Sequence, residues 1–252
     1  MKRPHYTMDE VRASVHGIDS WWTRFFIDPI ALRLTYVIAN FTPLSPNAVT
    51  FFTLPLIFVS AYFFFLGDFL SLIIGAFLYE FNFALDCVDG KLARLQKKTS
   101  SFGAFFDIYL DNINVFINLF ALVYGQYRIS GKVGFVIIGF IYLFAHMTQL
   151  LMKYLALEVI DRNIKKDFYA GARSGEKRGM PDRLRVFFAK RGLSPVLFTT
   201  VEGEAFVFFF GPISGYVFPA IVFSLIFVAV FFILKSIFYF SSCVKKDKKA
   251  RA

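Results

Sequence analysis

Cysteine and acidic residues are scarce in this sequence of 252 residues. The two cysteines, Cys87 and Cys243, cannot build a disulfide framework, so they give no indication of an oxidising compartment. The first residues, MKRPHYTMDEVRASV, have no apolar core, and we therefore expect no secretory signal peptide. Only 18 acidic residues oppose 28 basic residues, which leaves a formal charge of +10.

Apolar residues dominate what is present. The sequence is 57% hydrophobic and 20% aromatic, it contains 36 phenylalanines, and its mean hydropathy is +0.57. This is the composition of a membrane protein and not of a soluble domain of the same length. The positive charge alone would fit a nucleic-acid-binding protein, but the basic residues lie between long apolar runs, as in cytoplasmic loops. We therefore expect a lipid bilayer as a partner and no nucleic acid.

Six apolar runs approach the length of about 20 residues that a helix needs to cross a bilayer. They cover Val49–Leu66, Phe69–Leu85, Phe102–Tyr124, Val133–Leu157, Pro195–Phe210 and Val217–Phe240. The fifth run is short, and we expect it to extend past Pro212. The sequence thus predicts an all-α integral membrane protein with six transmembrane helices, formed by residues 45–241.

The segment before the first run, residues 1–44, mixes charged residues with Trp21, Trp22 and other apolar residues, and it is interrupted at Asp28-Pro29. This pattern predicts an amphipathic juxtamembrane segment that lies along the membrane interface, with its tryptophans at headgroup depth. A buried helix is the alternative.

Basic residues predict the orientation of the chain. They concentrate in the amino-terminal segment, in the linker after the second run, in a long loop at about 158–193 and in a tail at 242–252, whereas the opposite loops hold only Arg128 and Lys132. By the positive-inside rule both termini face the cytoplasm, and the protein resides in the cytoplasmic membrane. The long loop either binds a phosphorylated acceptor or anionic headgroups, or is an ordinary solvated loop.

Acidic and small residues recur at helical spacing where the second run ends. Asp86, Asp89, Gly90 and Ala93 share one face of that helix with the basic Arg94. After a short Lys/Thr/Ser linker, the third run carries Gly103, Asp107 and Asp111 at steps of four residues. The spacing predicts that four carboxylates converge from two adjoining helices, with their site on the cytoplasmic side.

Such a cluster is costly in a membrane, at roughly 2.5 to 3.5 kcal/mol for each unpaired aspartate, and like charges held close together repel. A divalent cation resolves both problems, because carboxylate oxygens suit Mg²⁺ or Mn²⁺, and these ions in turn hold phosphates. A solvated helix end with ordinary surface acids is the alternative. It does not explain why Gly90 and Ala93 share the face of the acids.

The whole pattern, Asp86-x-x-Asp89-Gly90-x-x-Ala93-Arg94, eight residues, then Gly103-x-x-x-Asp107-x-x-x-Asp111, resembles the signature of the CDP-alcohol phosphotransferases, or class I CDP-alcohol phosphatidyltransferases. These membrane enzymes make phospholipids from CDP-activated precursors. The resemblance implies that Asp86, Asp89, Asp107 and Asp111 hold two Mg²⁺ or Mn²⁺ ions. It also implies that Asp111 serves as the general base, and that the enzyme is a homodimer.

The resemblance further assigns the CDP group to the small and basic residues of the signature: Gly90, Ala93, Arg94 and Gly103. Asn47 and Thr50, at the start of the first run, either lie near the nucleotide or mark the beginning of a helix. For the acceptor we select Lys153 and Glu202. Lys153 either meets a phosphate or extends to the interface. Glu80, Glu202 and Glu204 either contact the acceptor or make hydrogen bonds between helices.

Two reactions share this signature, and both release CMP. One transfers a phosphatidyl group from CDP-diacylglycerol to a small polar alcohol, and the other transfers a headgroup from a CDP-alcohol to a lipid, or to a glycan outside core phospholipid synthesis. The sequence leaves both open, and with them the identity of the acceptor. A cation transporter whose acids line an ion path is the rival from another class, but transport does not explain Gly90, Ala93, Arg94 and Gly103.

Overall fold

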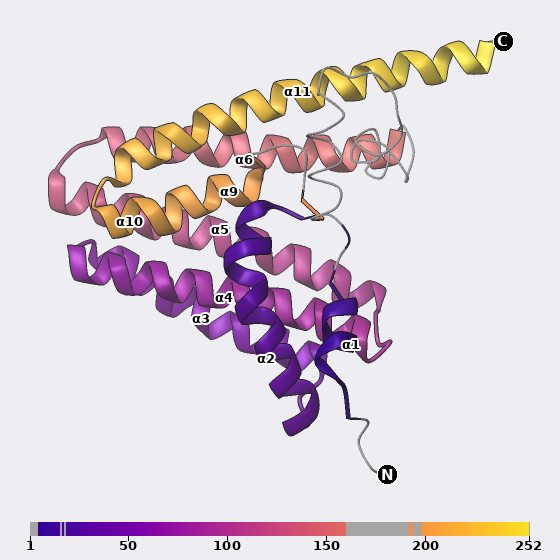
Figure 1. Cartoon of the computed structure of the whole chain (residues 1–252). Coiled ribbons are helices and arrows are strands. Elements are labelled where there is room, and N and C mark those ends of the chain that lie inside the picture. Colours follow the sequence, from indigo (N-terminus) through magenta and orange to yellow (C-terminus); the bar gives the residue numbers. More distant parts are fainter. Residues whose placement is uncertain (1–4, 16, 18, 160–191, 194–197, 252) are drawn as a thin grey trace.

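The computed structural model describes residues 5–15, 17, 19–159, 192–193 and 198–251, and these residues are almost entirely helical. The elements are α1 (Met8–Ala13), the π-helical turn η1 (Thr23–Ile27), α2 (Asp28–Phe41), α3 (Pro46–Leu66), α4 (Phe69–Leu95), α5 (Ser101–Ser130), α6 (Gly134–Val159), α9 (Thr200–Ala205), η2 (Phe206–Phe210), α10 (Gly211–Ser214) and α11 (Val217–Arg251). Figure 1 shows the long helices running side by side, with α2 crossing α4. An isolated bridge between Asp19 and Leu193 is the only β-type pairing in this part of the chain.

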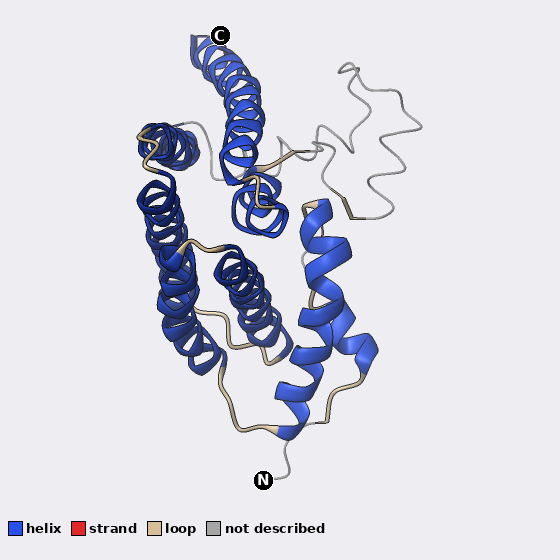
Figure 2. Cartoon of the chain, turned by 90° about the vertical axis from the view of Figure 1, so that its left-hand side faces the viewer, coloured by secondary structure: helices blue, strands red, loops and turns tan. Residues whose placement is uncertain are grey.

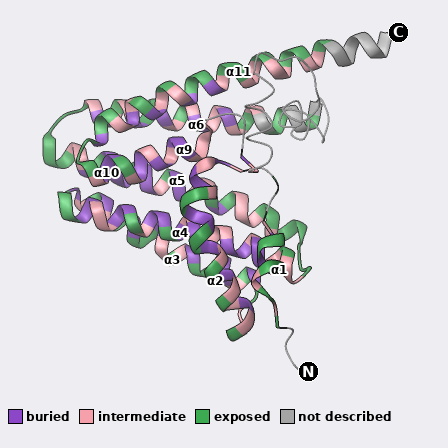
Figure 3. Ribbon diagram, in the orientation of Figure 1, coloured by how far each residue is buried: buried purple, intermediate pink, exposed green. Residues whose placement is uncertain are grey.

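Five helices are long and apolar enough to cross a membrane. They are Pro46–Leu66, Phe69–Leu95, Ser101–Ser130, Gly134–Met152 and Val217–Val244. Their outer faces carry exposed phenylalanines, such as Phe51, Phe120 and Phe144, which are 65%, 63% and 74% exposed (Figure 3). Apolar side chains turned outward all along the bundle suit lipid tails better than water. The expected all-α membrane protein is therefore confirmed.

The fifth predicted run is shorter than a membrane span. Its described part forms α9, η2 and α10, which follow one another directly from Thr200 to Ser214. A capping box between Thr199 and Glu202 begins this helix, and Gly215 ends it with a φ of 74°. At 1.5 Å per residue such a helix is about 22 Å long, less than the roughly 30 Å of a hydrocarbon core. The described residues thus contain five candidate spans where the sequence predicts six.

Helix ends are fixed by caps that can be read from the sequence. The side chains of Ser45, Asp68 and Ser100 accept backbone hydrogen bonds in the first turns of α3, α4 and α5. Hydrogen bonds from Ser71, chiefly from its side chain, lower the pKa of Asp68, which lies between two spans. Gly67 ends α3 in the left-handed region, with a φ of 78°. These caps set where α4 ends and α5 begins, and so they set the position of the acidic segment.

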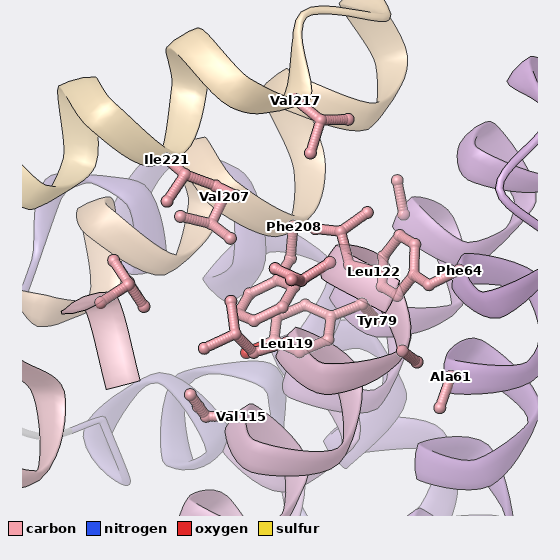
Figure 4. Packing of buried hydrophobic residues seen from close by; sticks show 14 of the residues in the cluster. Ala61, Phe64, Tyr79, Val115, Leu119, Leu122, Val207, Phe208, Val217 and Ile221 are labelled. Atoms are coloured by element: carbon pink, nitrogen blue, oxygen red, sulfur yellow. The ribbon is translucent and has the colours of Figure 1, made fainter. Parts of the chain in front are cut away.

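The main core lies where α3, α4 and α5 meet α6, η2 and α11. Phe208 of η2 is fully buried at its centre, and its ring stacks on Tyr79 of α4 with centroids 4.3 Å apart (Figure 4). Figure 2 shows the helix formed by α9, η2 and α10 lying between α4 and α11. This short helix therefore belongs to the bundle although it does not match the length of its neighbours.

The amino-terminal segment packs on α4. Ala31 and Ala39 of α2 share a buried cluster with Val88 and Leu92 of α4. Trp22 is only 3% exposed, and its Nε1 donates a hydrogen bond to Glu80 Oε2 at 3.0 Å. Trp22 is thus buried within the protein, where a carboxylate supplies the partner that its indole N–H needs, and the headgroup depth of the two tryptophans stays a prediction.

Candidate active site

The turn between α4 and α5 brings the acidic residues of the two helices together. α4 ends at Leu95, and Lys97 takes a positive φ of 54° where the chain reverses. Ser100 then begins α5 by accepting a hydrogen bond from the backbone N–H of Gly103 at 3.0 Å. Because the linker is this short, the carboxyl-terminal end of α4 and the start of α5 lie next to one another. Residues that are far apart in the signature become neighbours in space.

Asp86, Asp89 and Asp107 form a compact group of carboxylates. One oxygen from each lies within 4.8 Å of the others, and Asp89 is only 4% exposed. Among the described residues none of the three forms an ion pair with a basic side chain, although Arg94 is close enough to attract Asp89 and Asp107. Three repelling carboxylates that share one small space make a set of oxygen ligands suited to a hard divalent cation.

Asp111, the fourth predicted ligand, lies one helical turn beyond Asp107 and is not part of this compact group. It lines a cavity of about 250 Å³ together with Asp86. The cavity extends between the long helices, and its wall includes residues of α3, α4, α5, α6, α9 and α11. The acid cluster therefore stands beside a cavity in which Asp111 can meet a bound molecule.

The start of α3 lies against the signature. Thr50 Oγ1 donates a hydrogen bond to Asp89 Oδ2 at 2.5 Å, and it also contacts the carbonyl of Pro46. A Cβ on Gly103 would lie 3.7 Å from Asn47 Oδ1. Asn47 and Thr50, which the sequence also allows as a mere helix start, are thus neighbours of the residues expected to receive CDP.

Arg94 spans the distance between α4 and the amino-terminal segment. Its Nε donates a hydrogen bond to the carbonyl of Ser14 at 2.6 Å, and a Cβ on Gly90 would lie 3.4 Å from its Nη1. Gly90, Ala93 and Arg94 keep the shared face that their spacing predicts, and Ala93 is partly exposed on it. The guanidinium is therefore held over the face that carries the small residues.

Of the two residues that the sequence analysis selects for the acceptor, the structure describes the side chain of Glu202 only. Glu202 is fully buried and does not line the cavity. Its Oε2 accepts hydrogen bonds from the backbone N–H and the hydroxyl of Thr199, and its Oε1 accepts one from the N–H of Trp21 at 3.0 Å. The acidic residue that faces the cavity from α9 is instead Glu204. The side chain of Lys153 and residues 160–191 of the basic loop lie outside the described part of the chain.

A buried ion-pair network on another side of α4 escaped the sequence analysis. Asp28 Oδ1 lies 2.8 Å from Lys91 Nζ, and its Oδ2 lies 2.9 Å from Arg24 Nη1. Asp28 and Lys91 are only 3% and 4% exposed. In the sequence analysis, Arg24 and Lys91 belong to the basic residues from which the orientation of the chain is predicted. The Lys91–Asp28 pair joins positions 63 residues apart, and no local spacing signals such a contact.

Comparison with known proteins supports the significance of the acidic segment. A family model described as CDP-alcohol phosphatidyltransferase matches residues 43–234, which is well over half of the chain. The chain belongs to this family. The matched residues include α3, α4 and α5, and with them every member of the signature.

Two curated proteins match part of this chain. A "Bifunctional IPC transferase and DIPP synthase" of Aquifex aeolicus (strain VF5) is 33% identical over 114 residues, or 44% of this chain and 25% of that protein. A protein of the same name from Thermococcus kodakarensis (strain ATCC BAA-918 / JCM 12380 / KOD1) is 33% identical over 102 residues, or 40% and 22%. The aligned part spans about a quarter of each relative, so their names describe longer proteins.

Proposed function

We propose that this CDP-alcohol phosphatidyltransferase family member transfers a phosphoalcohol from a CDP-linked donor to an alcohol acceptor and releases CMP. The observation that carries the proposal is the group of Asp86, Asp89 and Asp107, of which Asp86 lines the same cavity as Asp111. The names of the two relatives, which include transferase and synthase activities, agree with this reaction class. The proposed setting is phospholipid biosynthesis, with CDP-diacylglycerol or a CDP-alcohol as donor.

The acids fit a metal centre because every candidate ligand atom is a carboxylate oxygen, the donor type that Mg²⁺ and Mn²⁺ prefer. We assign Asp86, Asp89 and Asp107 to these ions, with Asp111 completing a set for two of them. When bound, the ions supply charge neutralisation at the diphosphate of the donor. Thr50 fixes the carboxylate of Asp89 through its hydrogen bond, which leaves the other oxygen of Asp89 available.

The nucleotide would lie on the face of α4 and α5 that carries small residues. Gly90, Ala93 and Gly103 have no side chain beyond Cβ, so a ligand can approach the helix backbone there. Arg94, held by Ser14, is placed to meet an anionic group, and its guanidinium suits phosphate oxygens. Asn47 offers an amide beside Gly103.

Asp111 would remove the proton from the acceptor hydroxyl as its oxygen attacks the donor phosphorus. One phosphorus–oxygen bond forms to the acceptor, the bond from that phosphorus to the bridging oxygen of the diphosphate breaks, and CMP leaves with this oxygen. No serine, cysteine, lysine or histidine belongs to the signature, so direct attack is simpler than a covalent intermediate. Holding both reactants in one cavity supplies the alignment that an in-line displacement requires.

The membrane arrangement completes the proposal. Thr200–Ser214, packed between α4 and α11, would be the sixth element at membrane depth, and the basic segments would keep both termini and the site on the cytoplasmic face of the cytoplasmic membrane. The amino-terminal segment 1–44 would lie at the interface with part of its apolar surface against α4. Family resemblance favours a homodimer.

The variant Asp111→Asn tests these roles by separating binding from chemistry. We expect it to bind CDP within a few-fold of the parent protein, because the nucleotide contacts are unchanged, and to lose at least about a thousandfold in CMP release, because its amide cannot take a proton. Calorimetry with CDP and a CMP-release assay measure the two effects. The exposed Asp9→Asn is the matched control, and loss of CDP binding with turnover retained would overturn the assignment.

A further inference from the structure

Three buried polar atoms line the inner part of the cavity without a hydrogen-bond partner among the described residues. They are Asn82 Oδ1 on α4 and His146 Nδ1 and Gln149 Oε1 on α6. Their residues are 3%, 8% and 5% exposed, so bulk solvent does not reach them. Buried polar groups are nearly always paired, and each such atom in a cavity wall indicates that a molecule in the cavity supplies the partner.

The protein itself fixes how these groups face the cavity. Gln149 Nε2 donates a hydrogen bond to the carbonyl of Val228 at 2.9 Å, so Gln149 Oε1 must be the atom turned away from that carbonyl. Glu204 Oε2 accepts a hydrogen bond from the hydroxyl of Tyr79 at 3.4 Å. Its Oε1 lies 3.8 Å from His146 Nδ1, too far for a direct hydrogen bond. A hydroxyl inserted there would satisfy both groups.

The wall is rich in acceptors. Asn82, Gln149, Glu204 and Asp111 all line this space, and each side chain carries an oxygen that can accept a hydrogen bond. Lys235 is the one basic side chain among the described lining residues, and its ammonium lies over the ring of Phe231, 4.1 Å from the centroid. Acceptor atoms attract the O–H groups of a polyol and repel phosphate or carboxylate groups. The chemistry of the inner wall therefore matches hydroxyls.

We infer that this inner wall, formed by Asn82, His146, Gln149 and Glu204, binds the acceptor, and that the acceptor is a small polyhydroxy alcohol and not the hydroxyl of a lipid. The inference rests on the proposed function. Several acceptor groups in the wall call for several hydroxyls, which a polyol supplies, whereas a diacylglycerol offers only one. One hydroxyl would face Asp111 while the others bind the inner wall.

The acceptor preference of the unaltered protein is the first test. The protein in detergent micelles is given CDP-diacylglycerol or CDP-glycerol as donor, with glycerol, inositol, sorbitol or diacylglycerol as acceptor, and CMP release is measured. At least one polyol should support CMP release with a kcat/KM at least tenfold above that for diacylglycerol. Preference for diacylglycerol would overturn the inference and leave the proposed function standing. Absence of CMP release with every pair would overturn both.

Gln149→Leu tests the wall itself, because it removes the acceptor atom at similar volume. The matched control is Gln126→Leu, since Gln126 Nε2 also donates to a backbone carbonyl, that of Gly67, at 2.8 Å and outside the cavity. We expect Gln149→Leu to raise KM for the polyol at least tenfold with CDP binding unchanged, and Gln126→Leu to change neither. An unchanged KM in Gln149→Leu would show that the wall binds water only and would overturn the inference. An equal rise in both variants would do the same.

Discussion

Two groups of acidic residues at α4 differ in whether basic side chains neutralise them. Asp28 has a basic partner for each of its oxygens, Lys91 at 2.8 Å and Arg24 at 2.9 Å. In the group of Asp86, Asp89 and Asp107, one oxygen of each carboxylate lies within 4.8 Å of the others, and none forms an ion pair among the described residues. The first group is electrically complete and joins the amino-terminal segment to the bundle. In the proposed function the second group receives its positive charge from a bound cation, whereas the first is a structural ion pair.

The difference shows how one helix serves two purposes. Asp89 and Lys91 are two residues apart, so they point to nearly opposite sides of α4. On the Lys91 side the ion pair with Asp28 holds the end of the helix in place. On the Asp89 side the helix presents its carboxylate to Thr50 and to the other acids. Stability on one side of α4 therefore supports the geometry of the site on the other.

The largest effect is expected at the group that lacks a basic partner. Asp86→Asn should lower CMP release at least about a thousandfold, because it removes an assigned metal ligand. The melting temperature, measured in a chelator, should stay the same or rise, because one of three repelling charges is gone. Activity and thermal unfolding of the same preparation measure both. A clear fall in melting temperature together with near-normal activity would make Asp86 a structural residue.

The ion-paired group of Asp28, Lys91 and Arg24 should affect stability more than activity. Lys91→Met leaves the buried Asp28 with only Arg24 of its two basic partners, and we expect it to lower the free energy of unfolding by about 3 kcal/mol. CDP binding at temperatures where the variant is folded should fall much less than in a metal-ligand variant. The double variant Asp28→Asn/Lys91→Met should recover part of the stability, since the buried carboxylate charge is gone and the new amide still offers an oxygen to Arg24. Equal stability of the parent and Lys91→Met would contradict the role of this ion pair.

A smaller effect is expected where an acid is satisfied by a hydrogen bond. Trp22→Phe removes the N–H that donates to Glu80 Oε2 at 3.0 Å in a buried setting, and should cost about 2 kcal/mol of unfolding free energy. Glu80→Gln keeps an acceptor oxygen for Trp22 and should cost less. Thermal unfolding of both variants gives the ranking. The reverse order would mean that the charge of Glu80, and not its hydrogen bond to Trp22, matters for stability.

The acidic segment could be predicted from the sequence because its geometry is local. Asp86, Asp89 and Asp107 lie on two helices joined by a short linker, so helical spacing suffices to bring them together. The five candidate spans follow in the same way from runs of apolar residues. Local periodicity thus accounts for the bundle and for the centre of the candidate site.

Contacts between distant segments could not be predicted in this way. Thr199 and Glu202 have the local spacing of a capping box, but only the packed structure shows that Glu202 also binds the backbone of Trp21 and that Glu204 faces the cavity. Burial of Trp22 depends on Glu80, 58 residues away. The length of the fifth helix depends on a capping box and on Gly215, which a hydrophobicity pattern does not register.

The most direct test of the central claim is CMP release from a CDP-linked donor before and after removal of divalent ions. If Asp86, Asp89 and Asp107 require a cation from outside the chain, exhaustive chelation should abolish CMP release, and Mg²⁺ or Mn²⁺ should restore it. The melting temperature should rise on adding the ion to the parent protein but not to Asp86→Asn. Full CMP release after exhaustive chelation would contradict the account, because the three acids would then need no external charge to act.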